Sequence, residues 1–285
     1  METFRTKLGQ VERALIAADV FCGHGYDSPH DEAVALLLCA AGLDPEQDES
    51  LLDEPYQQDA DALLDQWVEA RCEERRPVAY IVGEAYLAGA RFVVDERALI
   101  PRSPIAHLAM EAFQPWWGAG DPPSTIVEVC CGGGNLGILA AKVFADARVW
   151  LADLDASALS LALENVALHQ LTDRVGCYQG DLLSAIAPES VDLIIANPPY
   201  VSAIEMAALP PEYRHEPPIA LVAEEEGTQL ASQLMKEAAR ALRPEGLMVL
   251  EVGETMWEME SRFPKVPFLW LDLPQGGNGI AAMRA

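Results

Sequence analysis

The second half of the chain, from about residue 124 onward, alternates short β-branched or apolar runs with longer helical segments, and this alternation constrains the fold more than any other feature. Parallel strands need a crossover between them, usually a helix, so such alternation predicts a doubly wound α/β sheet. The expected strands are residues 125–129, 148–152, 175–178, 191–196, 247–252, 268–273 and 280–283, and the expected helices are residues 135–144, 156–168 and 228–242.

The last two expected strands, residues 268–273 and 280–283, are too close in the sequence for a helical crossover. Only a turn fits between them, and strands joined by a turn run antiparallel. The glycine-rich residues 276–279 are expected to make that turn. The sheet should therefore be mostly parallel with an antiparallel end.

The first quarter of the chain has helical periodicity instead. Three helices are expected, over residues 4–20, 31–41 and 59–74, with Ser28 and Pro29 as the start signal of the second. Strand-like residues then flank Ala88-Gly89 over residues 80–94, which predicts a β-hairpin. We expect a helical substrate-recognition domain over residues 1–76, a β-hairpin linker over 77–104 and a catalytic domain over 105–285.

The net charge of the chain indicates which kinds of molecule it can bind. It carries 45 acidic and 19 basic side chains, a formal net charge of −26 at pH 7. Such a surface repels a phosphate backbone, because binding by counterion release needs Lys and Arg. Residues 1–90 hold 19 of the acidic and six of the basic residues, half of the net charge. We therefore expect no binding of free nucleic acid, and either a basic protein partner or a charge that serves solubility alone.

Several further classes are excluded. No stretch approaches the roughly 20 apolar residues of a membrane span, and the N-terminus lacks the pattern of a secretory signal. The six cysteines are dispersed, without a Cys-x-x-Cys pair, as expected of reduced thiols in a cytoplasmic protein. His24 and His30 lack the neighbouring ligands of a metal site, so no metal is expected.

A glycine-rich turn, Gly132-Gly133-Gly134, follows the first expected strand of the α/β part. Glycines here let the backbone approach a ligand at the start of a helix. The spacing to Gly137 also matches a dinucleotide fingerprint. Glu128, however, lies four residues before the first glycine. An acid at this turn suits a cationic ligand such as S-adenosylmethionine better than a pyrophosphate.

Carboxylates follow the next two expected strands. Asp153 ends the second strand, 21 residues beyond Gly132, where a carboxylate can accept both hydroxyls of a ribose. Asp155 competes for this role, but we interpret it as the N-cap of the helix that begins at residue 156. Asp181, after the third strand, can accept from an adenine amino group, with an ordinary loop acid as the alternative.

The sequence Asn197-Pro198-Pro199-Tyr200 follows the fourth expected strand. The two prolines stiffen the loop and remove two backbone donors. The Asn197 side-chain carbonyl and the Pro198 backbone carbonyl can then both accept from one planar NH₂ group, with Tyr200 against its plane. An amide or exocyclic amine is a poor nucleophile because its lone pair is delocalised. Two acceptors on its hydrogens help to localise that lone pair, and in-line positioning supplies the rest.

These features together resemble the class I methyltransferases that act on planar NH₂ groups. Two subgroups share the Asn-Pro-Pro-Tyr motif: adenine-N6 methyltransferases and protein-(glutamine N5) methyltransferases of the HemK/PrmB type. Residues 76–81, 92–94 and 99–102 resemble the inter-domain hairpin of the second subgroup. The PrmB branch of it is indicated by residues 21–33, 101–105, 209–217 and 276–279. The resemblance covers nearly the whole chain.

The resemblance implies a class I fold with a seven-stranded sheet and S-adenosylmethionine-dependent methylation of a glutamine side-chain amide in a ribosomal protein. In this branch the substrate is the third large-subunit ribosomal protein. The implied cofactor-binding residues are Glu128, Gly132, Gly134, Asp153, Asp181 and Asn197. The implied substrate-binding residues are Asn197, Pro198, Pro199, Tyr200 and Glu216, of which Asn197, Pro198 and Tyr200 are expected to be catalytic.

The sequence departs from the family pattern in a few places. The usual Gly-Ser-Gly is Gly132-Gly133-Gly134, the usual opening Asp is Glu128, and the usual Asp-Gly-Leu is replaced within residues 224–230. These changes leave room for a paralogue that methylates another protein or a small molecule. Two further alternatives are an adenine-N6 methyltransferase, against which the charge argues, and a non-catalytic protein that kept the fold, against which the intact Asn-Pro-Pro-Tyr argues. The oligomeric state is also open, with a homodimer as one alternative.

Overall fold

A computed structural model describes residues 2–45, 49–56, 58–117, 121–223, 227–273 and 276–285. The chain divides into two compact units. Unit 1 contains residues 1–85 together with residues 210–215, and unit 2 contains residues 86–209 and 216–285. The sequence-based division at residues 76 and 104 stays a prediction. The inclusion of residues 210–215 in unit 1 is a feature that the sequence did not indicate.

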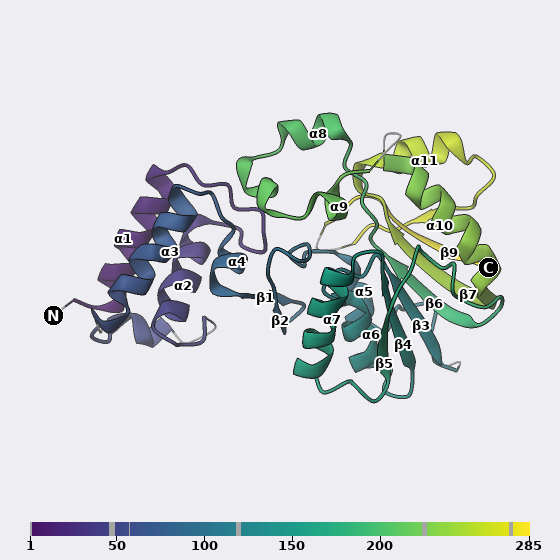
Figure 1. Cartoon of the computed structure of the whole chain (residues 1–285), viewed down its shortest axis with the longest axis horizontal. Coiled ribbons are helices and arrows are strands. Elements are labelled where there is room, and N and C mark those ends of the chain that lie inside the picture. Colours follow the sequence, from purple (N-terminus) through teal and green to yellow (C-terminus); the bar gives the residue numbers. More distant parts are fainter. Residues whose placement is uncertain (1, 46–48, 57, 118–120, 224–226, 274–275) are drawn as a thin grey trace. The chain divides into compact units, whose positions relative to one another are not determined.

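Unit 1 is helical, as expected (Figure 1). Ser28 caps α2, because its side chain accepts a hydrogen bond from the Asp31 N–H. Leu8, Leu15, Leu36 and Leu64 form a common core between α1, α2 and α3. The helices are α1 (Phe4–Ala17), α2 (Pro29–Ala40), α3 (Asp61–Cys72) and α4 (Val78–Val82), with the 3₁₀ turns η1 (Glu49–Asp53), η2 (Gln58–Ala60) and η3 (Pro211–His215).

A buried ion cluster holds η3 within unit 1. The Arg71 side chain is fully buried and donates through Nε to Oε2 of Glu32 at 2.7 Å and through Nη1 to Oε1 of Glu212 at 3.1 Å. Arg75 also pairs with Glu212, with 3.0 Å between Nη2 and Oε1. His215, at the end of η3, donates through Nε2 to the Glu74 carbonyl oxygen at 2.8 Å. Charges buried this deeply need partners, and here each partner comes from a different part of the chain.

The predicted hairpin is present, but it is shorter than expected. It consists of β1 (Glu84–Leu87) and β2 (Ala90–Val93), joined at Ala88 and Gly89, which both have positive φ. Two such residues form the tight turn that matches the twist of a hairpin. The expectation that strand structure begins at residue 80 is wrong. The helix α4 starts after Pro77 and ends at Gly83, whose left-handed conformation stops it.

Unit 2 contains a seven-stranded sheet in the order β5-β4-β3-β6-β7-β9-β8. The first five strands in this order are parallel, and β9 runs antiparallel to both β7 and β8. This confirms the doubly wound α/β fold, with its antiparallel end. The strands are β3 (Thr125–Val129), β4 (Arg148–Asp153), β5 (Val175–Gln179), β6 (Val191–Ala196), β7 (Leu242–Glu251), β8 (Leu269–Trp270) and β9 (Ile280–Arg284).

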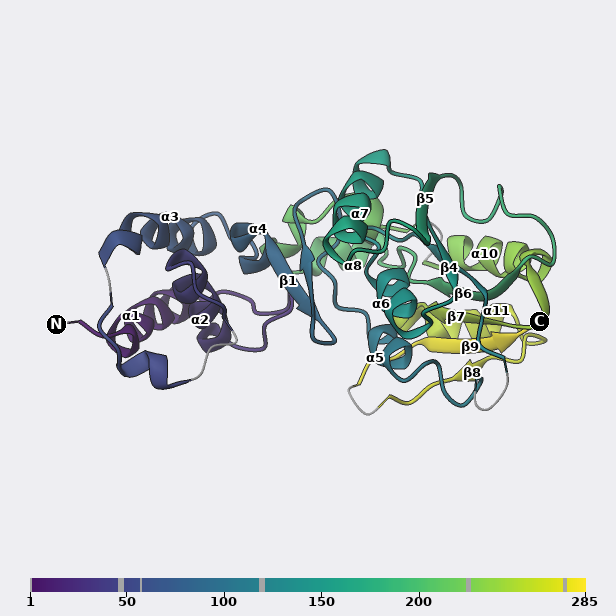
Figure 2. The same cartoon turned by 90° about the horizontal axis from the view of Figure 1, so that it is seen from below.

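Helices cover both faces of the sheet. Figure 2 shows α5, α6 and α7 along one side of it and α10 and α11 along the other. Leu234 and Met259 join the core on the second side, together with Val127, Ile194 and Met248 from the strands. The helices of unit 2 are α5 (Ile105–Met110), α6 (Asn135–Val143), α7 (Ala156–Leu168), α8 (Ala203–Ala208), α9 (Pro218–Leu221), α10 (Thr228–Ala241) and α11 (Met256–Arg262), with the 3₁₀ turn η5 (Gly253–Thr255).

Among the described residues, no helix combines the length and the apolar character needed to cross a membrane. Within the same part of the chain, no three His, Cys, Asp or Glu side chains converge in a way that could hold a metal ion.

Candidate active site

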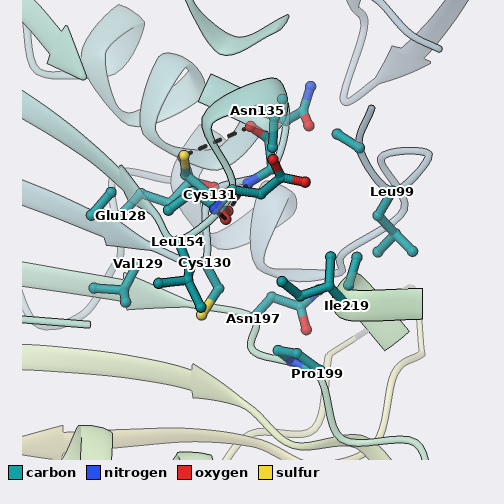
Figure 3. Close-up of a pocket in the computed structure, with 18 of the residues that line it drawn as sticks. Leu99, Glu128, Val129, Cys130, Cys131, Asn135, Leu154, Asn197, Pro199 and Ile219 are labelled. Carbon is teal, nitrogen blue, oxygen red and sulfur yellow. Dashed lines mark hydrogen bonds between the residues drawn. The ribbon is translucent and has the colours of Figure 1, made fainter. Parts of the chain in front are cut away.

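A pocket in unit 2 lies where the carboxyl ends of β3, β4, β5 and β6 meet, the edge at which open α/β sheets bind ligands. Figure 3 shows Glu128, Cys130 and Cys131 at one side of this pocket, Asn197 and Pro199 below, and Leu99 and Ile219 opposite. Of the residues expected to bind ligands, those that line the pocket are Glu128, Gly132, Asp153, Asp181, Asn197 and Pro199.

Glu128 holds the first turn of α6, which follows the glycine turn. This side chain is only 3% exposed, and its Oε2 and Oε1 accept from the backbone N–H groups of Gly137 at 2.8 Å and Leu136 at 3.3 Å. Burial raises the pKa of Glu128 to about 8, against the lowering effect of these two donors. A Cβ at position 137 would lie 2.8 Å from the Glu128 carboxylate and 2.4 Å from Leu151, so the close packing of α6 on the sheet requires glycine there.

Asp153 connects the end of β4 to the glycine turn. Its Oδ2 accepts from the Gly132 N–H at 2.9 Å, and its Oδ1 accepts from the Asp155 N–H at 3.0 Å. Each oxygen keeps a further lone pair for a ligand. Asp155 instead caps α7, because its Oδ1 accepts from the N–H of Ser157 at 2.8 Å. This confirms the N-cap interpretation of Asp155.

Two polar side chains in the pocket are free to bind a ligand. Within the described residues, neither the Asp181 carboxylate nor the Asn197 side-chain amide forms a hydrogen bond. Asn197 directly follows β6, so its position is fixed by the sheet and by the two prolines after it. Pro198 is buried, whereas Pro199 lines the pocket.

Tyr200 and Gly134 lie behind the pocket surface and are not among its lining residues. The Tyr200 hydroxyl donates to Oε1 of Glu251 at 3.2 Å, and its ring packs on the backbone of Gly253. Gly134 is the N-cap residue of α6, with Leu151 and Ala162 close to the position that a Cβ would take. Both residues therefore support the two loops that form the pocket.

Glu216 supports the opposite wall. It is 1% exposed, and its carboxylate accepts from Arg102 through Nη1 at 2.6 Å and Nη2 at 2.8 Å, and from the Ile100 N–H at 3.0 Å. A bidentate pair of this kind fixes geometry as well as charge. Glu216 therefore does not line the pocket itself. It holds Arg102, which does.

Sequence reasoning missed Asn165 and Asn135. Asn165 on α7 is fully buried, and its amide joins β2 to the glycine turn by donating to the carbonyls of Val93 at 3.1 Å and Gly133 at 3.0 Å. Asn135 lines the pocket at 8% exposure, and its Nδ2 is a buried donor that has no hydrogen-bond partner among the described residues. No local pattern marks the role of either residue: Asn135 is the first residue of α6, directly after the glycine turn, and Asn165 is a single Asn within α7.

The adjacent thiols of Cys130 and Cys131 are poor nucleophiles. Burial raises the pKa of both, and the carboxylates of Asp153 and Glu128 raise it further. A thiol that stays protonated at neutral pH does not attack an electrophile. Their place in the pocket wall is therefore a packing role.

The fold and the pocket define a class. Unit 2 has a class I methyltransferase fold, because its seven-stranded sheet contains one antiparallel strand. A glycine turn follows the first strand of the α/β part, a carboxylate ends the second, and Asn-Pro-Pro-Tyr follows the fourth. Comparison with family models agrees. Residues 119–209 match the methyltransferase small domain, and residues 16–83 match the PrmC N-terminal domain.

Two curated relatives match almost the entire chain. A ribosomal protein uL3 glutamine methyltransferase from Francisella tularensis is 36% identical, covering 93% of this chain and 85% of the relative. One from Bordetella pertussis is 38% identical, covering 98% of this chain and 94% of the relative. The chain belongs to the family of ribosomal protein uL3 glutamine methyltransferases, which confirms the resemblance found in the sequence.

Solved structures support the fold. The hMettl16 catalytic domain, crystallised in complex with MAT2A 3′UTR hairpin 6, is 14% identical, with a TM-score of 0.53. The match covers 79% of this chain and 81% of that domain. At this identity the likeness concerns the fold alone.

Proposed function

We propose that the protein uses S-adenosylmethionine to methylate the side-chain amide nitrogen of a glutamine in ribosomal protein uL3. The names of the two relatives support this substrate. The observation that carries the chemistry is Asn197, a pocket residue directly after β6 whose amide has no partner among the described residues. Residues 224–226, part of the stretch that departs from the family pattern, lie outside the described residues.

The pocket residues fit S-adenosylmethionine. Its ribose hydroxyls are donors, and Asp153 offers acceptor lone pairs on both carboxylate oxygens. Asp181 can accept from the adenine amino group, and Glu128 adds an acid near the glycine turn, which suits a cation. The unpartnered Nδ2 of Asn135 is a donor for the carboxylate of the ligand. The bound cofactor supplies an electrophilic methyl group on a sulfonium.

The motif loop, residues 197–200, orients the substrate amide. The Asn197 side-chain oxygen and the Pro198 carbonyl accept from its two N–H groups, which pulls electron density toward nitrogen. Tyr200, which lies behind the pocket surface, restricts the orientation of the substrate amide plane by holding the motif loop in place. The amide nitrogen would form a bond to the methyl carbon as the sulfonium–methyl bond breaks, which would leave S-adenosylhomocysteine as a neutral thioether. The methylated nitrogen would then lose one proton to water, so no strong base is needed before transfer. Positioning and electrostatics carry the rate enhancement.

The net charge favours the same protein partner and argues against a nucleic acid. A net charge of −26 opposes binding to free nucleic acid, including an adenine-N6 substrate, and favours a basic ribosomal protein. We infer that residues 1–76 recognise the substrate, because half of the net charge lies on residues 1–90. Dispersed thiols and a ribosomal substrate favour the cytoplasm.

The decisive experiment incubates the protein with S-adenosylmethionine carrying a labelled methyl group and with ribosomal proteins from cells that lack this activity. Mass mapping should place the label on a glutamine amide of uL3. Label on adenine or on another amino acid would refute the proposal.

A further inference from the structure

Glu251, the last residue of β7, is a buried carboxyl beside the motif loop. The strand β7 pairs with β6, whose carboxyl end continues into Asn197. Both oxygens of Glu251 are engaged: Oε2 accepts from the Ser103 hydroxyl at 2.5 Å and Oε1 from the Tyr200 hydroxyl at 3.2 Å. One side chain thus joins the motif loop to the wall segment, residues 99–103, on the other side of the pocket.

Tyr200 is restrained at both ends by this arrangement. Its hydroxyl is held by Glu251, and its ring packs on Gly253, where an added Cβ would lie 2.6 Å from ring atom Cε2. A tyrosine side chain has two soft torsions, and fixing the ring face and the hydroxyl together fixes both. The orientation of the ring therefore depends on the carboxyl of Glu251.

The wall segment is restrained in a similar way. Ser103 lines the pocket and is 7% exposed; its hydroxyl donates to Glu251 and accepts from the Ile105 N–H at 3.2 Å. The neighbouring Arg102 is held by Glu216. Residues 102 and 103 are thus each fixed by a different buried carboxyl.

Keeping a carboxyl at this position is costly to the fold. Glu251 is 7% exposed, and burial raises its pKa, while the donors Ser103 and Tyr200 and the charge of Arg102 lower it. Burying a carboxyl without need costs free energy that an apolar residue would not. The two donors are Ser103 in the pocket wall and Tyr200 directly behind it, and a network that joins them gives a reason for the carboxyl's presence.

We propose that Glu251 is a positioning residue for methyl transfer, acting through Tyr200 on the substrate amide and through Ser103 on the wall segment. This inference rests on the proposed function, because the amide is the group that Tyr200 restricts. Small misplacements of reacting groups cost large factors in rate, so loss of either hydrogen bond should lower kcat more than it changes cofactor affinity.

The test combines kinetics with a double-mutant cycle. Glu251→Gln should lower kcat about tenfold and leave the Kd for S-adenosylmethionine within about twofold. In a Tyr200→Phe background it should lower kcat by a smaller factor, because the route through Tyr200 is already lost and only the route through Ser103 remains. The matched control is Glu237→Gln in the same unit, whose carboxylate accepts from the Leu183 N–H at 2.9 Å and should leave kcat unchanged. Full kcat in Glu251→Gln, or factors that simply multiply in the double variant, would overturn the inference.

Two further measurements keep the test decisive. If Glu251→Gln does not fold, Ser103→Ala breaks the wall-side bond while leaving the carboxyl in place, and unchanged kcat in that variant counts against the inference. Fluorine NMR of 3-fluorotyrosine at position 200 reports ring orientation without any substrate. Its signal should shift in Glu251→Gln and not in Glu237→Gln; an unchanged signal overturns the inference, whereas absent methylation by the wild type refutes only the proposed function.

Discussion

The carboxylate of Asp153 and the backbone N–H of Gly132 form a hydrogen bond of 2.9 Å, which ties the end of β4 to the glycine turn after β3. Two neighbouring parallel strands thus form one rigid edge of the pocket. The bond is charge-assisted when Asp153 is ionised, and such bonds are stronger than neutral ones. Asp153 therefore shapes the turn, and its remaining lone pairs are the acceptors that the proposed function assigns to a ribose.

The first prediction separates Asp153 from its neighbour Asp155. Asp153→Ala should weaken S-adenosylmethionine binding roughly 10- to 100-fold, because hydrogen bonds to a charged group contribute about 1.5–3 kcal/mol. Asp155→Ala removes the cap of α7 and should lower stability by about 1 kcal/mol, with a smaller effect on affinity. Calorimetry and thermal melts measure both. Equal loss of affinity in the two variants would contradict the assignment of the ribose to Asp153.

The second prediction concerns Asn197. Asn197→Ala should reduce kcat at least about 100-fold, the usual cost of removing one preorganised hydrogen-bond partner, while the Kd for S-adenosylmethionine changes only a few-fold. The control is Asn278→Ala, an exposed Asn that donates to Glu254. Single-turnover assays and cofactor binding separate the two effects. Wild-type turnover in Asn197→Ala would refute the proposed mechanism.

Glu128 gives a pH-dependent prediction. With its pKa raised to about 8, Glu128 is largely protonated at pH 7 in the free protein. A bound cation favours the carboxylate, so binding should release up to one proton, and affinity should fall as the pH drops below 8. Calorimetry at pH 7 in two buffers of different ionisation enthalpy counts the protons.

Glu128→Gln is the matched variant, because it keeps the shape of the side chain and cannot ionise. Its binding should lack the part of the proton release that belongs to Glu128, whereas Glu237→Gln should behave like the wild type. The same pKa shift affects folding. The unfolded chain ionises Glu128 from its ordinary pKa of 4.5 upward, so this group's contribution to stability falls as the pH rises from 4.5 to 8. Equal proton release in both variants would exclude Glu128 as the source.

Much of unit 2 could be predicted because its local signals agree with its tertiary environment. The bounds of β3, β6 and α7 match the expected ones, since β-branched runs are buried as strands and Asp155 caps the helix. The pocket residues at the carboxyl ends of those strands followed from the same pattern. Most of the pocket residues could therefore be predicted from the order of the strands and from the residues that follow each strand.

What the sequence did not indicate depends on contacts between distant segments. Glu251 meets Ser103 from 148 positions away, and Arg71 meets Glu212 from 141 positions away. No local sequence pattern predicts contacts between residues so far apart in the chain. The helix α4 shows the same limit, because its Val- and Ile-rich sequence favours a strand until Pro77, Gly83 and burial in unit 1 decide otherwise.

The buried cluster around Arg71 predicts a large loss of stability. Arg71→Ala leaves Glu32 and Glu212 buried without their main partner, which costs about 3–5 kcal/mol. Arg5→Ala is the matched control, because Arg5 pairs with Asp53 on an exposed surface and its loss should not change the melting temperature measurably. Denaturant unfolding measures both variants. A small effect of Arg71→Ala would mean that the carboxyls find other partners.

The last prediction concerns the acidic charge of residues 1–90. If this region attracts a basic ribosomal protein, kcat/KM for uL3 should fall at least about tenfold between 0.05 and 0.5 M salt, because screening shortens the reach of surface charges. The affinity for S-adenosylmethionine should change far less, since the site proposed for it is the pocket at the carboxyl ends of the strands. A salt-independent kcat/KM would leave solubility as the role of the charge.

Charge-neutralising variants locate this effect within the chain. Asp65, Glu69 and Glu73 are exposed and spaced four residues apart along one face of α3 and its end. Converting them to Asn, Gln and Gln should raise KM for uL3 and flatten its salt dependence, because the steering charge is removed. The control neutralises three exposed acids of unit 2, Asp146, Asp173 and Glu258, which changes the net charge equally. Equal effects in both triple variants would assign the attraction to total charge, whereas a loss confined to the α3 variant would place the substrate on unit 1.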